Sequence, residues 1–175
     1  GSDIVIGAAN TDIIIAGAGN NTVNAGAGSN TIVATTGNDI IVTTTGVDII
    51  NVGDGDNAVN AGAEVNTIIT GSGTDIIITT TNGDIINAGA GTNTVNAGAG
   101  ANVIRGTTGN DIIITTSGDD DISVGAGTNV IDAGAGANTI VTTSGNDEVT
   151  TAGGIDIINV GDGDNEVNAG AAVNT

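Results

Sequence analysis

The chain has 175 residues, of which 31 are Gly, and contains no Phe, Tyr, Trp, Met, Cys, His or Pro. Twenty acidic residues face a single basic residue, Arg105, so the net charge is −19 at pH 7. This charge excludes nucleic-acid binding, which needs basic patches, and disfavours adsorption to an anionic membrane surface.

The composition also limits membrane insertion and catalysis. No apolar run approaches the ~20 residues of a membrane-spanning helix, so we expect no membrane insertion. His, Cys, Tyr and Lys are all missing, and the carboxylates recur identically along the chain, whereas an active site is singular. We therefore predict that the protein is not an enzyme.

An Asp or Asn recurs at every ninth residue from Asp3 to Asn174, and Val or Ile follows two positions after each one except the last. We number each nonapeptide so that the Asp or Asn is its sixth position. Positions one to five are then mostly small or polar and predict a turn, and positions seven to nine predict a short strand. These strands are expected at residues 4–6, 13–15, 22–24 and so on, at nine-residue intervals. A constant short period is typical of a solenoid, so we predict one all-β parallel β-solenoid array of about twenty nonapeptides over residues 1–175.

The longer period of the sequence is 36 residues. Two successive units carry Asp after a Thr-rich turn, as in Thr43–Asp48, and the next two carry Asn after a Gly/Ala turn, as in Ala88–Asn93. With 18 residues per coil, each edge stacks Asp on Asn, which relieves a repulsion of roughly 1–3.5 kcal/mol between carboxylates about 4.8 Å apart. With 36 residues per coil, the alternative, Asn stacks on Asn in amide ladders, and unrelieved Asp rows all but require cations. We favour 18 and keep 36 as the alternative.

The array begins and ends inside a repeat, at Gly1 and Thr175. We expect it to be a segment of a longer array or a filament subunit that associates end to end. Positions seven and nine should point outward, and in the Asp units they are often Ile or Val, as at Ile40 and Val42. This apolar stripe predicts lateral self-association as a second kind of partner contact.

The consensus of the units resembles the RTX nonapeptide, Gly-Gly-x-Gly-x-Asp-x-U-x, a calcium-binding repeat, over the whole chain. The resemblance implies an RTX-like β-roll with two nonapeptides per coil. It also implies calcium held between the turns of successive coils by backbone carbonyls and the sixth-position Asp, as suits a hard cation. The metal-ligand candidates implied by the resemblance are Asp3, Asp12, Asp39, Asp48, Asp75, Asp84, Asp111, Asp120, Asp147 and Asp156, with Asp54, Asp56, Asp162 and Asp164 as supplementary acids.

Departures from the family pattern leave a second interpretation open. The first Gly is nearly always replaced, as by Ala25 or Thr43, and half of the Asp positions are Asn. An Asn amide between two carboxylates could donate a hydrogen bond to either, and the rows would then form a metal-free structural ladder.

We expect a structural extracellular or cell-surface repeat protein, such as a stalk, an adhesin-like spacer or a self-stacking filament, stabilised by calcium. One alternative is an ice- or surface-binding solenoid that uses rows of Thr and Asn, since Thr clusters recur at Thr43–Thr45 and Thr79–Thr81. Another is a calcium-dependent C-terminal module of a secreted RTX-type protein. Glycan is a further candidate partner, because Asn20-Asn21-Thr22 is an N-glycosylation sequon.

Overall fold

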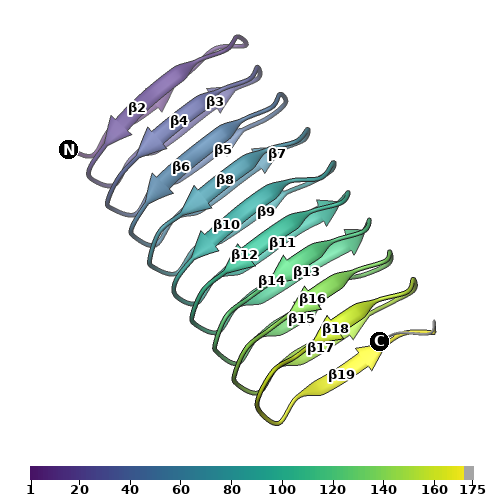
Figure 1. Ribbon diagram of the computed structural model, residues 1–175. Helices are drawn as coiled ribbons and strands as arrows, with labels where there is room; N and C mark the ends of the chain where they lie inside the picture. The colour runs from purple at the N-terminus through teal and green to yellow at the C-terminus, as the bar shows by residue number, and fades with distance from the viewer. Residues whose placement is uncertain (172–175) are drawn as a thin grey trace.

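The computed structural model describes residues 1–171 as a stack of flattened coils, each crossing from one parallel sheet to the other and back (Figure 1). Asn174, the last residue of the nine-residue series, lies outside the described residues. The ten-stranded sheet contains β1 (Ile4–Ile6), β3 (Thr22–Gly26), β5 (Ile40–Thr43), β7 (Ala58–Gly62), β9 (Ile76–Thr79), β11 (Thr94–Ala99), β13 (Ile112–Ser117), β15 (Val130–Asp132), β17 (Glu148–Thr151) and β19 (Glu166–Ala169). The nine-stranded sheet contains β2 (Ile13–Gly17), β4 (Thr31–Ala34), β6 (Ile49–Gly53), β8 (Thr67–Thr70), β10 (Ile85–Gly89), β12 (Val103–Gly106), β14 (Asp121–Ser123), β16 (Thr139–Val141) and β18 (Ile157–Asn159).

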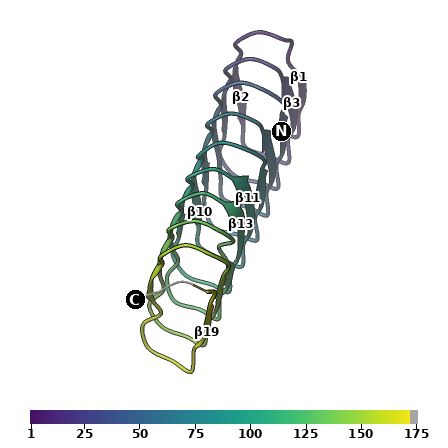
Figure 2. The ribbon, with the colours of Figure 1, turned by 90° about the vertical axis from the view of Figure 1, so that its right-hand side faces the viewer.

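The strand register confirms 18 residues per coil. In the ten-stranded sheet Val5 pairs with Val23, and in the nine-stranded sheet Ile14 pairs with Ile32. The 36-residue alternative is therefore wrong. Each edge stacks Asp on Asn, so like-charged rows never form. Successive coils follow one another along a single axis from the N-terminal to the C-terminal end (Figure 2). Ten strands spaced by about 4.8 Å give a stack about 43 Å long.

The core consists of two inward-facing positions per nonapeptide. The eighth position is the middle of each strand triplet, and its Ile or Val is buried throughout the interior of the roll, as at Ile41 and Val95. The first position was expected to belong to the turn, but it also faces inward, as at Ala25 and Val52. This part of the prediction is wrong because the extended backbone continues past the triplet, and alternation then returns every second side chain to the interior.

Positions seven and nine point outward, as predicted. Ile40 and Ile76 keep about half of their surface exposed, at 50% and 49%. Between them, above the small side chain of Ala58, lies a shallow apolar groove with a volume of about 100 Å³, which Val42 and Ile78 also line. No helix in residues 1–171 is long and apolar enough to cross a membrane.

The fourth position of nearly every described unit turns the chain tightly enough to require left-handed backbone angles. Gly109 has φ of +123°, and a Cβ there would overlap the carbonyl oxygen of Gly91 in the preceding coil. Three described units have another residue than Gly at this position: Asn10 has no positive φ, whereas Glu64 and Asn82 keep the left-handed angle, with φ of 81° and 74°. These two residues hold a conformation that L side chains rarely adopt.

Candidate metal sites along the two turn edges

The sixth-position side chains form two continuous hydrogen-bonded rows, one along each edge of the roll. In each row the Oδ1 atom of an Asp or Asn accepts the backbone N–H of the sixth-position residue one coil earlier. For example, Asn21 N donates to Asp39 Oδ1 at 2.8 Å, and Asp39 N donates to Asn57 Oδ1 at 3.0 Å. The same contact recurs without interruption from Asp3 to Asn165 on one edge and from Asp12 to Asp156 on the other. Both residue types carry Oδ1, so this contact explains why only Asp or Asn occurs here.

The second polar atom of the side chain distinguishes the two residue types. In every Asn unit of the described chain, Nδ2 donates to the carbonyl oxygen of the fourth-position residue in its own turn, at 2.8 Å for Asn21 on Gly19 and 2.9 Å for Asn102 on Gly100. Some of these amides also reach the carboxylate of the next coil, as Asn57 reaches Asp75 Oδ1 at 3.0 Å. The predicted amide-to-carboxylate bond therefore exists, but the bond to the turn carbonyl is the more regular one.

In an Asp unit, Oδ2 takes the place of this amide nitrogen. This Oδ2 atom lies beside the first position of its own turn, since a Cβ added at Gly106 would stand 2.8 Å from Asp111 Oδ2. An ionised carboxylate oxygen has no hydrogen to donate, so, unlike the Asn amide, it cannot cap the fourth-position carbonyl of its turn. Seven of these oxygens are buried without a hydrogen-bond partner, namely Oδ2 of Asp39, Asp48, Asp75, Asp84, Asp111, Asp120 and Asp147.

Burial raises the pKa of four of these carboxyls, those of Asp75, Asp84, Asp111 and Asp120, above the usual value for Asp. The hydrogen bond from the backbone N–H of the Asn one coil earlier opposes this shift in each case, and at Asp84 the hydroxyl of Thr79 opposes it more strongly. The exposed Asp56 adds a small repulsion that raises the pKa of Asp75 further. Burial thus opposes the ionisation of these four carboxyls, and a bound cation or a proton would relieve this unfavourable environment.

The first position, five residues before the sixth, carries a feature that the sequence analysis missed. In six Asp units it is a buried Thr, whereas in the Asn units it is Ala or Val. The hydroxyls of Thr43 and Thr79 donate to the first-position carbonyls of the next coil at 2.8 and 3.0 Å. Thr151 instead donates to Asp156 Oδ2 at 2.7 Å. The restriction of first-position Thr to Asp units is visible in the sequence and could have identified this contact.

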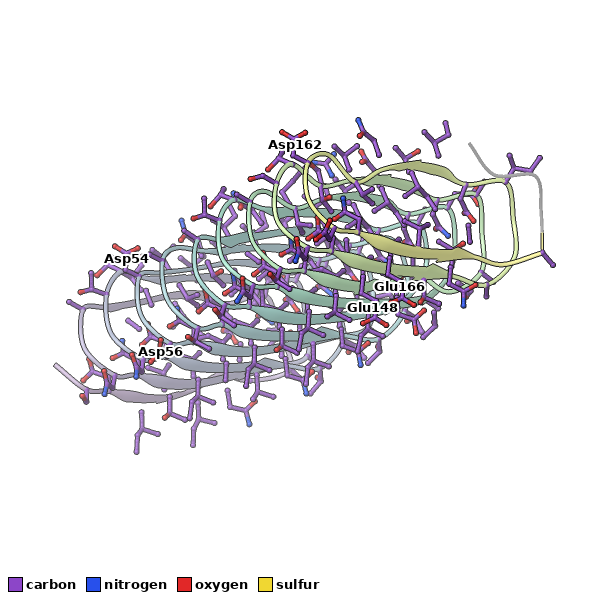
Figure 3. All side chains as sticks on the ribbon, turned by 90° about the horizontal axis from the view of Figure 1, so that it is seen from below. Asp54, Asp56, Glu148, Asp162 and Glu166 are labelled. Carbon is purple, nitrogen blue, oxygen red and sulfur yellow. The ribbon has the colours of Figure 1, made fainter. Side chains whose placement is uncertain are left out.

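The supplementary acids lie elsewhere. Asp54 and Asp56 are exposed on one turn, and Asp162 and Asp164 are exposed on the equivalent turn six coils later. Figure 3 shows Asp54, Asp56 and Asp162 at the turns and Glu148 and Glu166 on neighbouring strands. Asp54 Oδ1 accepts the backbone N–H and the hydroxyl of Ser72, both at 2.8 Å, and the backbone bond is the main reason that its pKa is lowered. These acids are not the partners of the buried Oδ2 atoms.

The candidates at the ends of the described rows differ from the interior ones. Asp3 is exposed, and Asp12 is only partly buried, with Oδ2 accepting the N–H of Ala8 at 3.1 Å. Asp156 is buried, but its Oδ2 already accepts the Thr151 hydroxyl. The seven interior Asp residues are therefore the ones whose second oxygen needs a partner.

The donor set of an interior Asp unit suits a hard cation. Nowhere in residues 1–171 do three acidic side chains gather into one metal-binding cluster, so each site would combine a carboxylate oxygen with main-chain carbonyl oxygens. Calcium takes six to eight oxygen ligands, which include carboxylates, carbonyls and water. The orphaned Oδ2 atoms and the uncapped turn carbonyls fit this chemistry.

The remaining sequence candidates lie on the outside of the roll. The Thr clusters begin at the buried strand ends Thr43 and Thr79 and continue into the turns, where Thr80 donates to the Gly62 carbonyl at 3.0 Å. The outer faces of both sheets mix aliphatic side chains with Thr, Asn and a few charged residues. The ice- or surface-binding alternative stays a prediction. Asn20 of the glycosylation sequon is exposed, and its Oδ1 accepts the Asn38 N–H at 2.9 Å.

The fold and the two edges define a structural repeat module, a parallel β-roll in which buried Asp carboxylates recur along each edge. The family model of the RTX calcium-binding nonapeptide repeat (4 copies) matches residues 1–32, 33–68, 69–104, 105–140 and 141–175, which together span the whole chain. The chain belongs to the RTX calcium-binding nonapeptide repeat family, as the sequence resemblance predicted, and calcium is the ligand that the repeats of this family bind. No curated protein and no solved structure matches it.

Proposed function

We propose that this chain is a calcium-stabilised extracellular spacer, a stiff stalk-like array whose coils are held together by cations bound along both edges. The observation that carries the proposal is the recurrence of buried, unpartnered Asp Oδ2 atoms on both edges of the roll. RTX repeats are typical of secreted proteins, and calcium modules outside the cell work at roughly 10⁻⁴–10⁻³ M calcium.

The proposed ligands are the Oδ2 atoms of the seven interior Asp residues together with the fourth-position carbonyls of their turns. One carboxylate per site makes each site weak by itself, but many sites along one cooperative stack add their effects. The net charge of −19 acts in the same direction, because bound divalent cations reduce the self-repulsion of the compact state. The same sites would serve equally if the array were a calcium-dependent module of a larger secreted protein.

Thermal unfolding followed by circular dichroism tests the proposal directly. We expect millimolar calcium to raise the melting temperature of the chain by several degrees above its value in EGTA. Magnesium at the same concentration should have much less effect, because it is smaller, demands near-ideal octahedral geometry and dehydrates reluctantly. Identical melting curves in calcium and in EGTA, with no heat of calcium binding by calorimetry, would eliminate the proposed role of calcium.

Self-association is the proposed partner interaction, with a second copy packed laterally on the outer face of the ten-stranded sheet. From β1 to β13 the outward positions of this face carry no charged side chain, and exposed Ile residues alternate with smaller ones. Ridges at Ile40 and Ile76 flank the groove above Ala58, so a copy displaced by one coil can place its own Ile ridge there.

Analytical ultracentrifugation of Ile76→Glu tests the lateral contact, with Thr67→Glu on the opposite sheet as the matched control. We expect concentration-dependent association in the wild type and in Thr67→Glu, and its loss in Ile76→Glu. If Ile76→Glu still associates, and a charged, Pro-containing cap on one terminus reduces the size of the assemblies, the contact is end-to-end stacking instead.

A further inference from the structure

The interior Asp units fall into two kinds, according to the side chain at the first position. The first position, five residues before the Asp, is Ala34 in the unit of Asp39 and Gly106 in the unit of Asp111. It is Thr in the other five units, those of Asp48, Asp75, Asp84, Asp120 and Asp147. The first position lies directly against the orphaned oxygen, since a Cβ added at Gly106 would stand 2.8 Å from Asp111 Oδ2. The residue at this position therefore decides what Oδ2 meets inside the roll.

A first-position Thr brings a hydroxyl donor to the carboxylate. Thr151 makes this hydrogen bond with Asp156 Oδ2 at 2.7 Å, and both residues are buried. The hydroxyl of Thr79 lies close enough to Asp84 to lower the pKa of that carboxyl, although it donates to the carbonyl of Ala97. Since a hydroxyl has one hydrogen and rotates freely, Thr79 can turn its donor from the carbonyl to the carboxylate.

Asp39 and Asp111 have no such alternative. Their side chains are 0% and 1% exposed, and their Oδ2 atoms have no hydrogen-bond partner. Neither the Ala34 side chain nor Gly106 carries a hydroxyl that could donate to the oxygen. Asp12, which also follows a Gly, differs because it lies near the open end of the roll and accepts the N–H of Ala8.

We propose that the first-position residue sets the calcium affinity of each Asp unit, and that Asp39 and Asp111 are the tight calcium sites of the described roll. This inference rests on the proposed function. Without calcium, the oxygen in a Thr-containing unit can be satisfied by the hydroxyl, and calcium must displace that bond. In the units of Asp39 and Asp111 the calcium-free state leaves the oxygen unpaired. Calcium binding there removes the whole free-energy cost of this buried, unpaired oxygen. A difference of one such hydrogen bond corresponds to about 5- to 150-fold in affinity.

Calcium titration by isothermal calorimetry of the full chain tests the proposal. Two reciprocal substitutions should change the number of tight calcium sites in opposite directions. Thr79→Val keeps the branched shape and removes only the hydroxyl, so we expect it to add one tight site, at Asp84. Ala34→Thr supplies the hydroxyl to Asp39 and should remove one tight site. Ala88→Thr makes the same change beside Asn93 and should leave the number of tight sites unchanged. Asp39→Asn should remove one tight site and so assign it.

The inference is overturned if Thr79→Val removes a tight site and Ala34→Thr adds one, because this would show that the Thr oxygen is itself a calcium ligand. Unchanged site numbers in a chain that binds calcium would also overturn it while leaving the proposed function intact. A wild-type chain that binds no calcium would refute both. If Ala34→Thr proves too large to fold, Ala34→Ser carries the same test, and in EGTA either variant should melt at a higher temperature than the wild type.

Discussion

Exchanging the two residue types of the ladder is the most direct perturbation of this roll. Asp111→Asn keeps an Oδ1 atom for the N–H of Asn93, which Asp111 accepts at 2.9 Å. It also replaces the orphaned Oδ2 with an amide that can donate to the carbonyl of Gly109, as Asn93 donates to Gly91 at 3.2 Å. We therefore expect Asp111→Asn to stabilise the chain in the absence of calcium, although it alters a candidate metal ligand.

The size of the effect follows from the single atom that changes. Leaving a buried polar atom unpaired costs about 1–3 kcal/mol, so supplying its hydrogen bond should raise the free energy of unfolding in EGTA by about that amount. For a chain of this length this is roughly 2–12 °C in melting temperature. The reverse exchange, Asn93→Asp, places a third carboxylate between Asp75 and Asp111. Two neighbours about 4.8 Å away repel it by roughly 2–7 kcal/mol in total at effective dielectrics of 80 to 20, so this variant should be strongly destabilised.

Urea and thermal unfolding of both variants, in EGTA and in millimolar calcium, measure these effects. In calcium the differences in stability among the three chains should be smaller, because Asp111→Asn has lost a ligand while Asn93→Asp has gained a carboxylate that cations can neutralise. The reasoning is refuted if Asp111→Asn melts below the wild type in EGTA, since Oδ2 would then already have a partner. Equal stability of all three chains in EGTA would show that the ladder does not distinguish Asp from Asn.

Three further predictions concern the turns and the buried carboxyls. Gly109→Ala should lower the free energy of unfolding by about 1–3 kcal/mol, because its φ is +123° and the new Cβ would meet the Gly91 carbonyl; Gly153→Ala, with nothing within 4 Å of the new Cβ, should change it by less than about 0.5 kcal/mol in urea unfolding. Glu64→Gly should stabilise the chain by roughly 0.5–1 kcal/mol by relieving a φ of 81°, and a lower melting temperature would contradict the assigned backbone angle. In EGTA, the four carboxyls with raised pKa bind more protons in the folded state than in the unfolded state, so stability should fall as pH rises from about 4 through their raised pKa values. Melting in EGTA across that range checks this, and a steady rise of stability with pH would contradict it, whereas in calcium the dependence should weaken or reverse because the metal needs ionised ligands.

The sequence alone was sufficient for the solenoid, the strand positions and the orientation of the side chains within each strand. The nine-residue period is uninterrupted, and alternation along an extended strand places Ile41 inside and Ile40 outside without further information. The family resemblance likewise depends only on spacing and residue type. These features are local, so no distant contact is needed to decide them.

The tertiary structure was needed wherever two coils meet. A pattern that repeats at both 9 and 36 residues is compatible with either coil length, and only the pairing of Val5 with Val23 selects 18. The N–H to Oδ1 ladder, the orphaned Oδ2 atoms and the contact of Thr151 with Asp156 likewise depend on which residues the stacking buries side by side. Each of these properties arises from neighbours 18 residues apart or from burial between the sheets, and the one-dimensional order of the residues does not specify which neighbours those are.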